Sequence, residues 1–216
     1  MTEAETVVKV YVPEGEGADG DATFERIRAV AEKFGPRVRV EREHAHSAQS
    51  VSLSVNGRAV PPSEAGSAEV PDWLVEAAIL RESGPKGFLF LCVANSARSQ
   101  MGEGVARLLA PADVRVQSAG SHPTSVRPEA ATVLTELGVD LSLHASKNVA
   151  DIDPTTVDTV ITLCAEEECP VFLGKALRLH WGLPDPAAVE GDEETRLNAF
   201  RTVRDELKRR LSVVFS

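Results

Sequence analysis

The fold of this chain is indicated most strongly by one stretch of its sequence, Cys92-Val93-Ala94-Asn95-Ser96-Ala97-Arg98-Ser99. The apolar run Phe88–Leu91 before it is typical of a short buried strand, and a helical pattern follows it from Ser99 to Leu109. A loop between the carboxyl end of a strand and the start of a helix gathers free backbone N–H groups, and the helix dipole adds partial positive charge there. Residues 93–98, which we call the cradle loop, are therefore predicted to bind a tetrahedral oxyanion.

The side chains around the cradle loop fit the chemistry of an oxyanion site. Cys92 is expected beneath the bound anion, where the same field stabilises a thiolate nucleophile. Arg98 offers a planar fork that can grip two oxygens, and Ser99 can donate a hydrogen bond to the thiolate. Asn95 tolerates the left-handed backbone angles of a tight loop. The alternative, in which Cys92 is a small buried apolar residue and Arg98 a surface charge, does not account for their spacing between a strand and a helix.

The rest of the second half alternates between strand and helix patterns, as a parallel-sheet α/β domain does. Two further strands are expected at Val114–Gln117 and Thr159–Leu163. Helices are expected at Pro128–Leu137 and at Glu193–Val213, the latter with an apolar face.

A domain boundary is predicted in the charged, Gly- and Pro-containing stretch around Gly84, which divides the chain into residues 1–84 and 85–216. The first half is expected to be a small α+β domain. Its pattern is strand, helix, strand, hairpin and helix, and the elements are expected at Val7–Val12, Thr23–Phe34, Val38–Val40, Val51–Val55 with Arg58–Val60, and Pro71–Leu80. This order looks thioredoxin-like, but the half contains no cysteine, and its role is left open among reductant docking, oligomerisation and stabilisation.

Composition narrows the classes of partner and compartment. The net charge of −10 argues against nucleic acid and anionic membrane as partners. No apolar run approaches the roughly 20 residues of a membrane span, and the N-terminus lacks the features of a signal peptide, so a cytoplasmic protein is expected. Three cysteines are too few for a disulfide scaffold, so in a reducing compartment a chemical or an inert role is favoured over a structural one. The oligomeric state is not indicated.

Several motifs of residues 87–216 together resemble the low-molecular-weight tyrosine phosphatases and the arsenate reductases built on the same fold. The motifs are residues 92–104, Ser118-Ala119-Gly120-Ser121, Val160–Cys164 with Cys169-Pro170, and His180-Trp181-Gly182-Leu183-Pro184-Asp185-Pro186. The resemblance implies a four-stranded parallel sheet flanked by helices and makes Asp185 the general acid. Gly102 departs from the alanine that is usual in the family, at a modest helix cost.

The other two cysteines favour a reductase over a phosphatase. When Cys92 attacks arsenic(V), arsenite can leave only if another thiol attacks the Cys92 sulfur and leaves a disulfide behind. Cys164, at the end of a parallel strand, is the expected second attacker, and Cys169 can then free Cys92. This relay matches what the resemblance implies for arsenate reductases that thioredoxin regenerates. No bound cofactor is expected, and a small thiol remains possible as the external reductant.

Other readings of these residues stay open at this point. The chain can be a low-molecular-weight phosphatase with incidental cysteines, or a reductase with residual phosphatase activity, or a non-catalytic binder of arsenite. Cys164 can be core packing, or can bind zinc with Cys169 and His180, although zinc prefers a fourth protein ligand. Asp185 can be a turn residue between prolines. A disulfide between Cys164 and Cys169 would also require the chain between them to bend, so a mobile loop is expected there.

The resemblance also implies a supporting site behind the cradle. Some of these reductases hold potassium there, at positions that correspond to Asn95, Glu103, Ser118 and Lys147. An ammonium at Lys147 would repel a cation and could replace it by pairing with Glu103. We therefore expect no metal and no potassium requirement. The alternative is that Lys147 is a solvated lysine.

Overall fold

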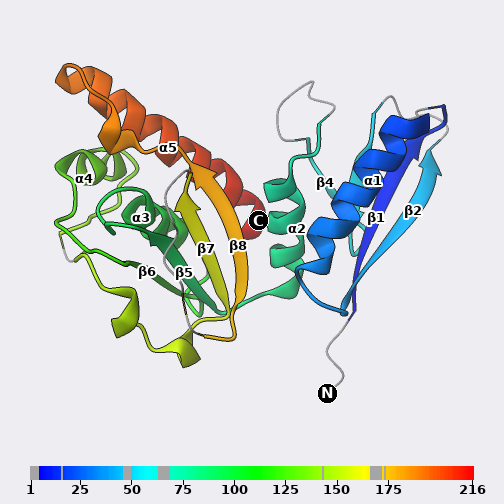
Figure 1. Cartoon of the computed structure of the whole chain (residues 1–216), viewed down its shortest axis with the longest axis horizontal. Coiled ribbons are helices and arrows are strands. Elements are labelled where there is room, and N and C mark those ends of the chain that lie inside the picture. The colour runs from blue at the N-terminus through cyan, green and yellow to red at the C-terminus, as the bar shows by residue number, and fades with distance from the viewer. Residues whose placement is uncertain are drawn as a thin grey trace. The chain divides into compact units, whose positions relative to one another are not determined.

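The computed structural model describes residues 5–15, 17–45, 50–62, 69–142, 144–165, 172 and 174–216. The chain divides into two compact units. One consists of residues 1–84 together with Ser216, and the other of residues 85–215 (Figure 1).

The first unit is a mixed four-stranded sheet with two helices. Its elements are β1 (Thr6–Pro13), α1 (Gly17–Glu32), β2 (Val38–Ala45), β3 (Ser52–Val55), β4 (Arg58–Val60) and α2 (Asp72–Ser83). The strand order is β2-β1-β3-β4, with β1 parallel to β2 and the other two pairs antiparallel. Asn56 and Gly57 have φ angles of 50° and 80°, which suit the predicted hairpin turn. The predicted α+β element order is confirmed, while the likeness to thioredoxin stays a prediction.

The two largest differences from the predicted boundaries in this unit are the start of α1 and the end of β2. Helix α1 begins at Gly17 and not at Thr23, because packing against the sheet outweighs the poor helix propensity of Gly17 and Gly20, the second of which is buried. Strand β2 continues past Val40 to Ala45, because it pairs with β1 along its whole length. The charged side chains of this extension hid it from a search for apolar alternation, and they suit an exposed sheet edge.

The second unit contains a four-stranded parallel sheet, which confirms the predicted fold class. Its strands are β5 (Gly87–Cys92), β6 (Arg115–Gly120), β7 (Thr159–Cys164) and β8 (Leu177–Leu183), in the order β6-β5-β7-β8. Its helices are α3 (Arg98–Leu109), α4 (Pro128–Thr135) and α5 (Glu193–Val214), with short 3₁₀ turns η1 (Val149–Asp151), η2 (Pro154–Thr156) and η3 (Pro186–Ala188).

Strand β8 is the fourth strand of this sheet. The family resemblance implied a fourth strand, but the sequence analysis did not assign residues to it. It alternates apolar and polar side chains, and Leu179, Trp181 and Leu183 are buried while the residues between them are exposed. This period of two is the ordinary signature of a strand with one buried face. The signal was therefore present in the sequence.

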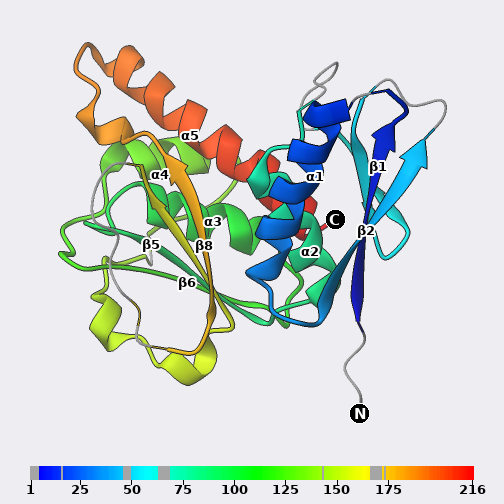
Figure 2. The same ribbon diagram turned by 45° about the vertical axis from the view of Figure 1, so that its right-hand side comes forward.

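The core of the second unit lies on both faces of the sheet, which explains why all six residues of β5 are buried. Helix α3 packs against β5, β6 and α5, and α5 also contacts α4 (Figure 2). On the other face, Leu89, Leu91 and Val160 form a cluster with Phe172. Among the described residues, no helix is both long and apolar enough to cross a membrane.

Candidate active site

The cradle loop lies at the carboxyl edge of the sheet, between the last residue of β5 and the first turn of α3. Three of its carbonyl groups are held by a segment that follows β6, residues 121–127, which we call the support segment. Backbone amides of this segment donate three hydrogen bonds, from His122 to Val93 O (2.9 Å), from Thr124 to Ala94 O (3.0 Å) and from Arg127 to Ser96 O (2.9 Å). A tight loop whose carbonyls face outward leaves its N–H groups to converge on the inside, which is the geometry that an oxyanion needs.

The support segment was missed by the sequence analysis. Its contribution comes from backbone amides, which every non-proline residue carries, so no side-chain type marked it. The one signal was Gly120 at the end of β6. A Cβ there would lie 2.4 Å from Val93 O, 2.8 Å from the Asn95 nitrogen and 2.9 Å from Cys92 O, so only glycine lets the cradle loop approach β6 this closely.

Asn95 is the residue around which the cradle loop turns. Its φ is 45°, and it is fully buried. Its side-chain Oδ1 accepts from the backbone N–H of Lys147 at 2.7 Å, and its Nδ2 donates to Ser99 Oγ at 2.8 Å and to Ser118 Oγ at 2.9 Å. The predicted left-handed conformation at Asn95 is therefore confirmed, and its cost is offset by a side chain that bonds at both ends.

Cys92 closes β5 at the base of the cradle loop, and its side chain meets Ser99. The Cys92 Sγ lies 2.9 Å from Ser99 Oγ, and both residues are buried. Because Ser99 Oγ already accepts a hydrogen bond from Asn95, the hydroxyl hydrogen is available to the sulfur. The Ser99 hydroxyl therefore donates to the sulfur that the sequence analysis assigned as the nucleophile.

The side chains of Arg98 and Asp185 form an ion pair beside the cradle loop. The Arg98 side chain is 5% exposed, and its Nη1 donates to Leu183 O at 3.2 Å. Its Nη2 lies 3.6 Å from Asp185 Oδ2, while Asp185 Oδ1 accepts from the Ala187 N–H at 3.2 Å and caps η3. Asp185 is thus a turn residue, as one interpretation of the sequence holds. It is also a carboxyl group beside the site, as the general-acid interpretation requires.

Cys164 closes β7, the strand next to β5, and is fully buried. Leu91 pairs with Thr162, so Cys92 lies opposite Leu163, one residue before Cys164. Neighbouring strands lie about 4.8 Å apart and rise about 3.3 Å per residue, so the two cysteine Cα atoms are roughly 6 Å apart, within disulfide range. Neither cysteine forms a disulfide. Cys169 and the predicted loop around residues 166–168 lie outside the described residues.

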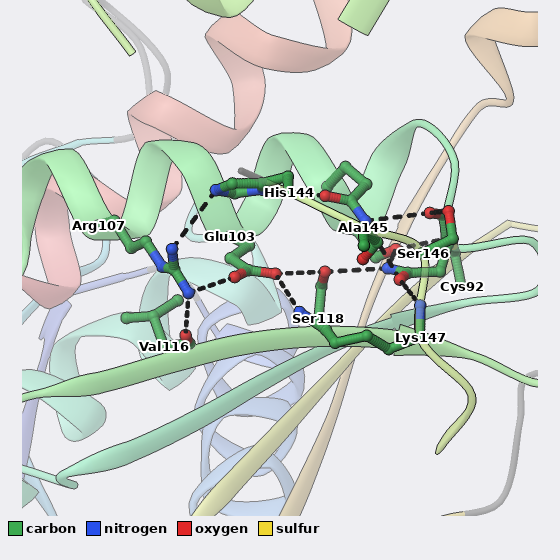
Figure 3. A network of polar contacts seen from close by, with 12 residues as sticks. Cys92, Glu103, Arg107, Val116, Ser118, His144, Ala145, Ser146 and Lys147 are labelled. Carbon is green, nitrogen blue, oxygen red and sulfur yellow. Dashed lines mark hydrogen bonds and ion pairs between the residues drawn. The ribbon is translucent and has the colours of Figure 1, made fainter. Parts of the chain in front are cut away.

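The supporting residues form a polar cluster behind the cradle, where Glu103 is 1% exposed (Figure 3). Ser118 Oγ donates to Glu103 Oε2 at 2.5 Å, and Lys147 Nζ lies 3.2 Å from the same oxygen. Arg107 Nη2 lies 2.5 Å from Glu103 Oε1. The expected pairing of Lys147 with Glu103 is therefore present, whereas Arg107 is a second cationic partner that the sequence analysis missed. In the part of the chain that the structure describes, no three His, Cys, Asp or Glu side chains gather as a metal site would need.

The site combines a strand, a loop that presents backbone N–H groups and a helix, with a cysteine at its base and an arginine beside it. This arrangement defines a thiol-dependent protein that acts on tetrahedral oxyanions. The model of one such family, described as low molecular weight phosphotyrosine protein phosphatase, matches residues 87–215. The chain belongs to this family.

Known relatives within this family are similar to the same part of the chain. An arsenate reductase of Halalkalibacterium halodurans is 38% identical over 128 residues, which are 58% of this chain and 92% of that protein. An arsenate reductase of Bacillus subtilis is 39% identical over 124 residues, or 56% of this chain and 89% of that protein. A solved structure described as an arsenate reductase in oxidized state is 30% identical, with a TM-score of 0.51, and the match covers 61% of this chain and 97% of that one.

Proposed function

We propose that residues 85–216 reduce arsenate to arsenite, with Cys92 as the nucleophile. The observation that carries the proposal is the position of Cys164. It ends the strand next to the one that Cys92 ends, so a second cysteine lies one strand away from the nucleophile. Hydrolysis of a phosphate ester has no use for that thiol, whereas a two-electron reduction requires it. The names of the relatives, which are arsenate reductases, support the same reaction.

The first step joins sulfur to arsenic. Arsenate lies among the inward N–H groups of the cradle loop, and the Arg98 guanidinium holds two of its oxygens. The Cys92 thiolate attacks arsenic(V), and one As–O bond breaks. Asp185, which lies 3.6 Å from Arg98 Nη2, gives a proton to the departing oxygen, which leaves as water. The product is a Cys92 thioester of arsenic(V), with no change in oxidation state.

The second step transfers the electrons. The Cys164 thiolate attacks the Cys92 sulfur, the S–As bond breaks, and its electron pair stays with arsenic, which leaves as arsenite. A Cys92–Cys164 disulfide remains. Side chains alternate along a strand, so Cys164 begins on the face of Val160, opposite to the α3 face that Cys92 shares with Leu163. Bond formation therefore requires the backbone at Cys164 to turn.

The third step restores Cys92. Cys169 attacks the Cys164 sulfur, which releases the Cys92 thiolate and leaves a Cys164–Cys169 disulfide. Two electrons from an external dithiol then reduce that disulfide, and thioredoxin is the proposed donor.

A second activity is favoured by the same geometry. Cys92, Arg98 and Asp185 are together sufficient to cleave a phosphate monoester through a phosphocysteine intermediate, and the family model is that of a phosphatase. We propose residual hydrolysis of small aryl phosphates. Ala187 follows the Asp185-Pro186 pair, where an aromatic residue would help to hold a phosphotyrosine ring, so large substrates should react poorly.

The decisive experiment is arsenate-dependent oxidation of NADPH in the presence of thioredoxin and thioredoxin reductase, repeated with glutathione and glutaredoxin. Cys92→Ser should abolish arsenate reduction and aryl phosphate hydrolysis together. Cys164→Ser and Cys169→Ser should stop arsenate turnover but leave hydrolysis intact, which makes hydrolysis the internal control for folding and for the cradle. Arsenate turnover that survives Cys164→Ser would refute the relay, and stoichiometric arsenite binding without turnover would make the protein a binder.

A further inference from the structure

Gln100, in the first turns of α3, is fully buried and bonds to the back of the cradle loop. Its Nε2 donates to Asn95 O at 3.2 Å, to Asn95 Oδ1 at 3.1 Å and to Ala145 O at 3.2 Å. All three acceptors are carbonyl oxygens. The amide of Gln100 can therefore serve Asn95 only in the orientation that points its NH₂ group at them.

The other end of the same amide is held by His144. The Gln100 Oε1 lies 3.0 Å from His144 Nδ1. If the amide were turned over, its oxygen would face three oxygens, and its NH₂ group would face a ring nitrogen that carries a hydrogen. A hydrogen on Nδ1 of His144 therefore fixes the orientation of Gln100, and the cost of the wrong orientation is high because the amide is buried.

A second contact decides which ring nitrogen of His144 carries that hydrogen. Arg107 Nη1 lies 3.4 Å from His144 Nε2, and arginine can only donate, so Nε2 must be the acceptor and Nδ1 the donor. Burial lowers the pKa of His144, and the nearby charges of Arg107 and Lys147 lower it further, while Glu103 and Asp140 oppose them. The ring is therefore neutral at pH 7.

These contacts close a ring of hydrogen bonds and ion pairs, which we call the polar ring (Figure 3). Its members, in order, are Glu103, Ser118, Asn95, Gln100, His144 and Arg107. Each member bonds to the next, and Arg107 returns to Glu103. His144 is half-buried at the outer side of this ring, away from Cys92, so it touches neither the reacting sulfur nor the site of the anion.

We infer that His144 is a positioning residue: acting through Gln100, it holds Asn95 in its left-handed conformation and keeps the cradle loop in shape for a tetrahedral oxyanion. The inference deepens the proposed function, since it concerns the same site. It assigns a task to a side chain that the reaction itself does not use.

The first test is spectroscopic and uses a variant only to assign signals. Nitrogen-15 NMR of the histidine rings in the reduced full-length protein should show His144 as the neutral tautomer with hydrogen on Nδ1, at pH 7. His144→Asn serves to assign its signals. The opposite tautomer would overturn the inference, because it would place a lone pair on Nδ1 against the Gln100 oxygen.

The second test compares variants by calorimetric titration with inorganic phosphate, at a temperature where all are folded. His144→Leu removes the donor and should weaken phosphate binding about tenfold, as expected for a buried amide that loses a partner. His144→Asn can donate from the position of Nδ1 and should remain within about threefold of the wild type. His44→Asn, in β2 of the first unit, is the control for loss of a histidine and should change nothing.

Three outcomes of the titration contradict the inference. They are wild-type affinity in His144→Leu, an equal loss in His144→Asn and His144→Leu, and a wild-type protein that binds no phosphate. Phosphate binding involves neither Cys164 nor electron transfer, so this test is separate from that of the proposed function. A protein whose phosphate affinity depends on His144 but that does not reduce arsenate would refute the reductase and leave the role of His144 standing.

Discussion

Replacement of Gly120 by alanine tests whether the cradle loop depends on its close approach to β6. The new Cβ would lie 2.4 Å from Val93 O, and real Cβ contacts do not fall below 3.0 Å, so that carbonyl must move by at least about 0.6 Å. The Asn95 nitrogen and Cys92 O, at 2.8 and 2.9 Å, must shift as well. Overpacking of this kind destabilises by about 1–3 kcal/mol. A displacement of about 1 Å in a catalytic site can reduce the rate about 100-fold, so Gly120→Ala should weaken phosphate binding and arsenate turnover on the order of tenfold.

Gly87 provides a matched control for this substitution. It begins β5 at the opposite edge of the same sheet, and a Cβ there would lie 2.2 Å from Thr156 O, an equally severe contact with backbone. Gly87→Ala should therefore lose a similar amount of stability in thermal denaturation while its folded fraction binds phosphate normally. If Gly120→Ala bound phosphate as tightly as the wild type, or if Gly87→Ala lost as much affinity, the reasoning about the cradle would be wrong.

Three further predictions concern charged groups of the second unit. Potassium at constant ionic strength should change arsenate turnover by less than about twofold, because Lys147 already places an ammonium 3.2 Å from Glu103, and a several-fold rise would contradict this. Asp185→Asn can still cap η3 but cannot donate a proton as an acid does, so kcat for arsenate should fall by about 100-fold while phosphate binding stays nearly unchanged in titration. Hydrogen bonds from Arg201 and then Arg204 lower the pKa of Glu136 to about 2, so its contribution to stability is complete above pH 4.5 and is lost as the pH falls toward 2. Melting temperatures should accordingly fall less between pH 5 and pH 2 in Glu136→Gln than in the wild type, and added salt should shrink the difference, because the pair is exposed.

The parts of the site that could be predicted are those in which sequence neighbours act together. Cys92, Asn95, Arg98 and Ser99 lie within one strand-loop-helix connection, so their spacing alone indicated the cradle and the contact between the sulfur and the hydroxyl. The pairing of Lys147 with Glu103 was reached through the family resemblance and not from any local pattern.

The parts that escaped prediction depend on contacts between distant segments. The support segment acts through amides that carry no side-chain signature, and nothing in the sequence around His144 indicated a partner 44 positions earlier, at Gln100. Helix α1 and strand β2 exceeded their predicted lengths, because tertiary pairing overrode weak local propensity.

Glu103 is a buried carboxylate behind a site for anions, in a chain of net charge −10, so it would be expected to repel the substrate. Arg107 and Lys147 both pair with it, so these three groups carry a net charge of +1 and do not repel the substrate. The carboxylate acts instead on the direction of the hydrogen bonds. An ionised carboxylate can only accept, so Ser118 must give it the hydroxyl hydrogen, and the Ser118 oxygen must then accept from Asn95 Nδ2.

The same direction is passed on to the sulfur. Because the NH₂ group of Asn95 faces Ser118, its second hydrogen goes to Ser99 Oγ, and the Ser99 hydroxyl is left to donate to Cys92 Sγ. The Asn95 amide cannot be turned over in this network, because its Oδ1 also accepts from the Lys147 N–H and from Gln100 Nε2. Glu103, Lys147 and Gln100 thus agree on one order of donors, which ends with the Ser99 hydroxyl donating to Cys92 Sγ.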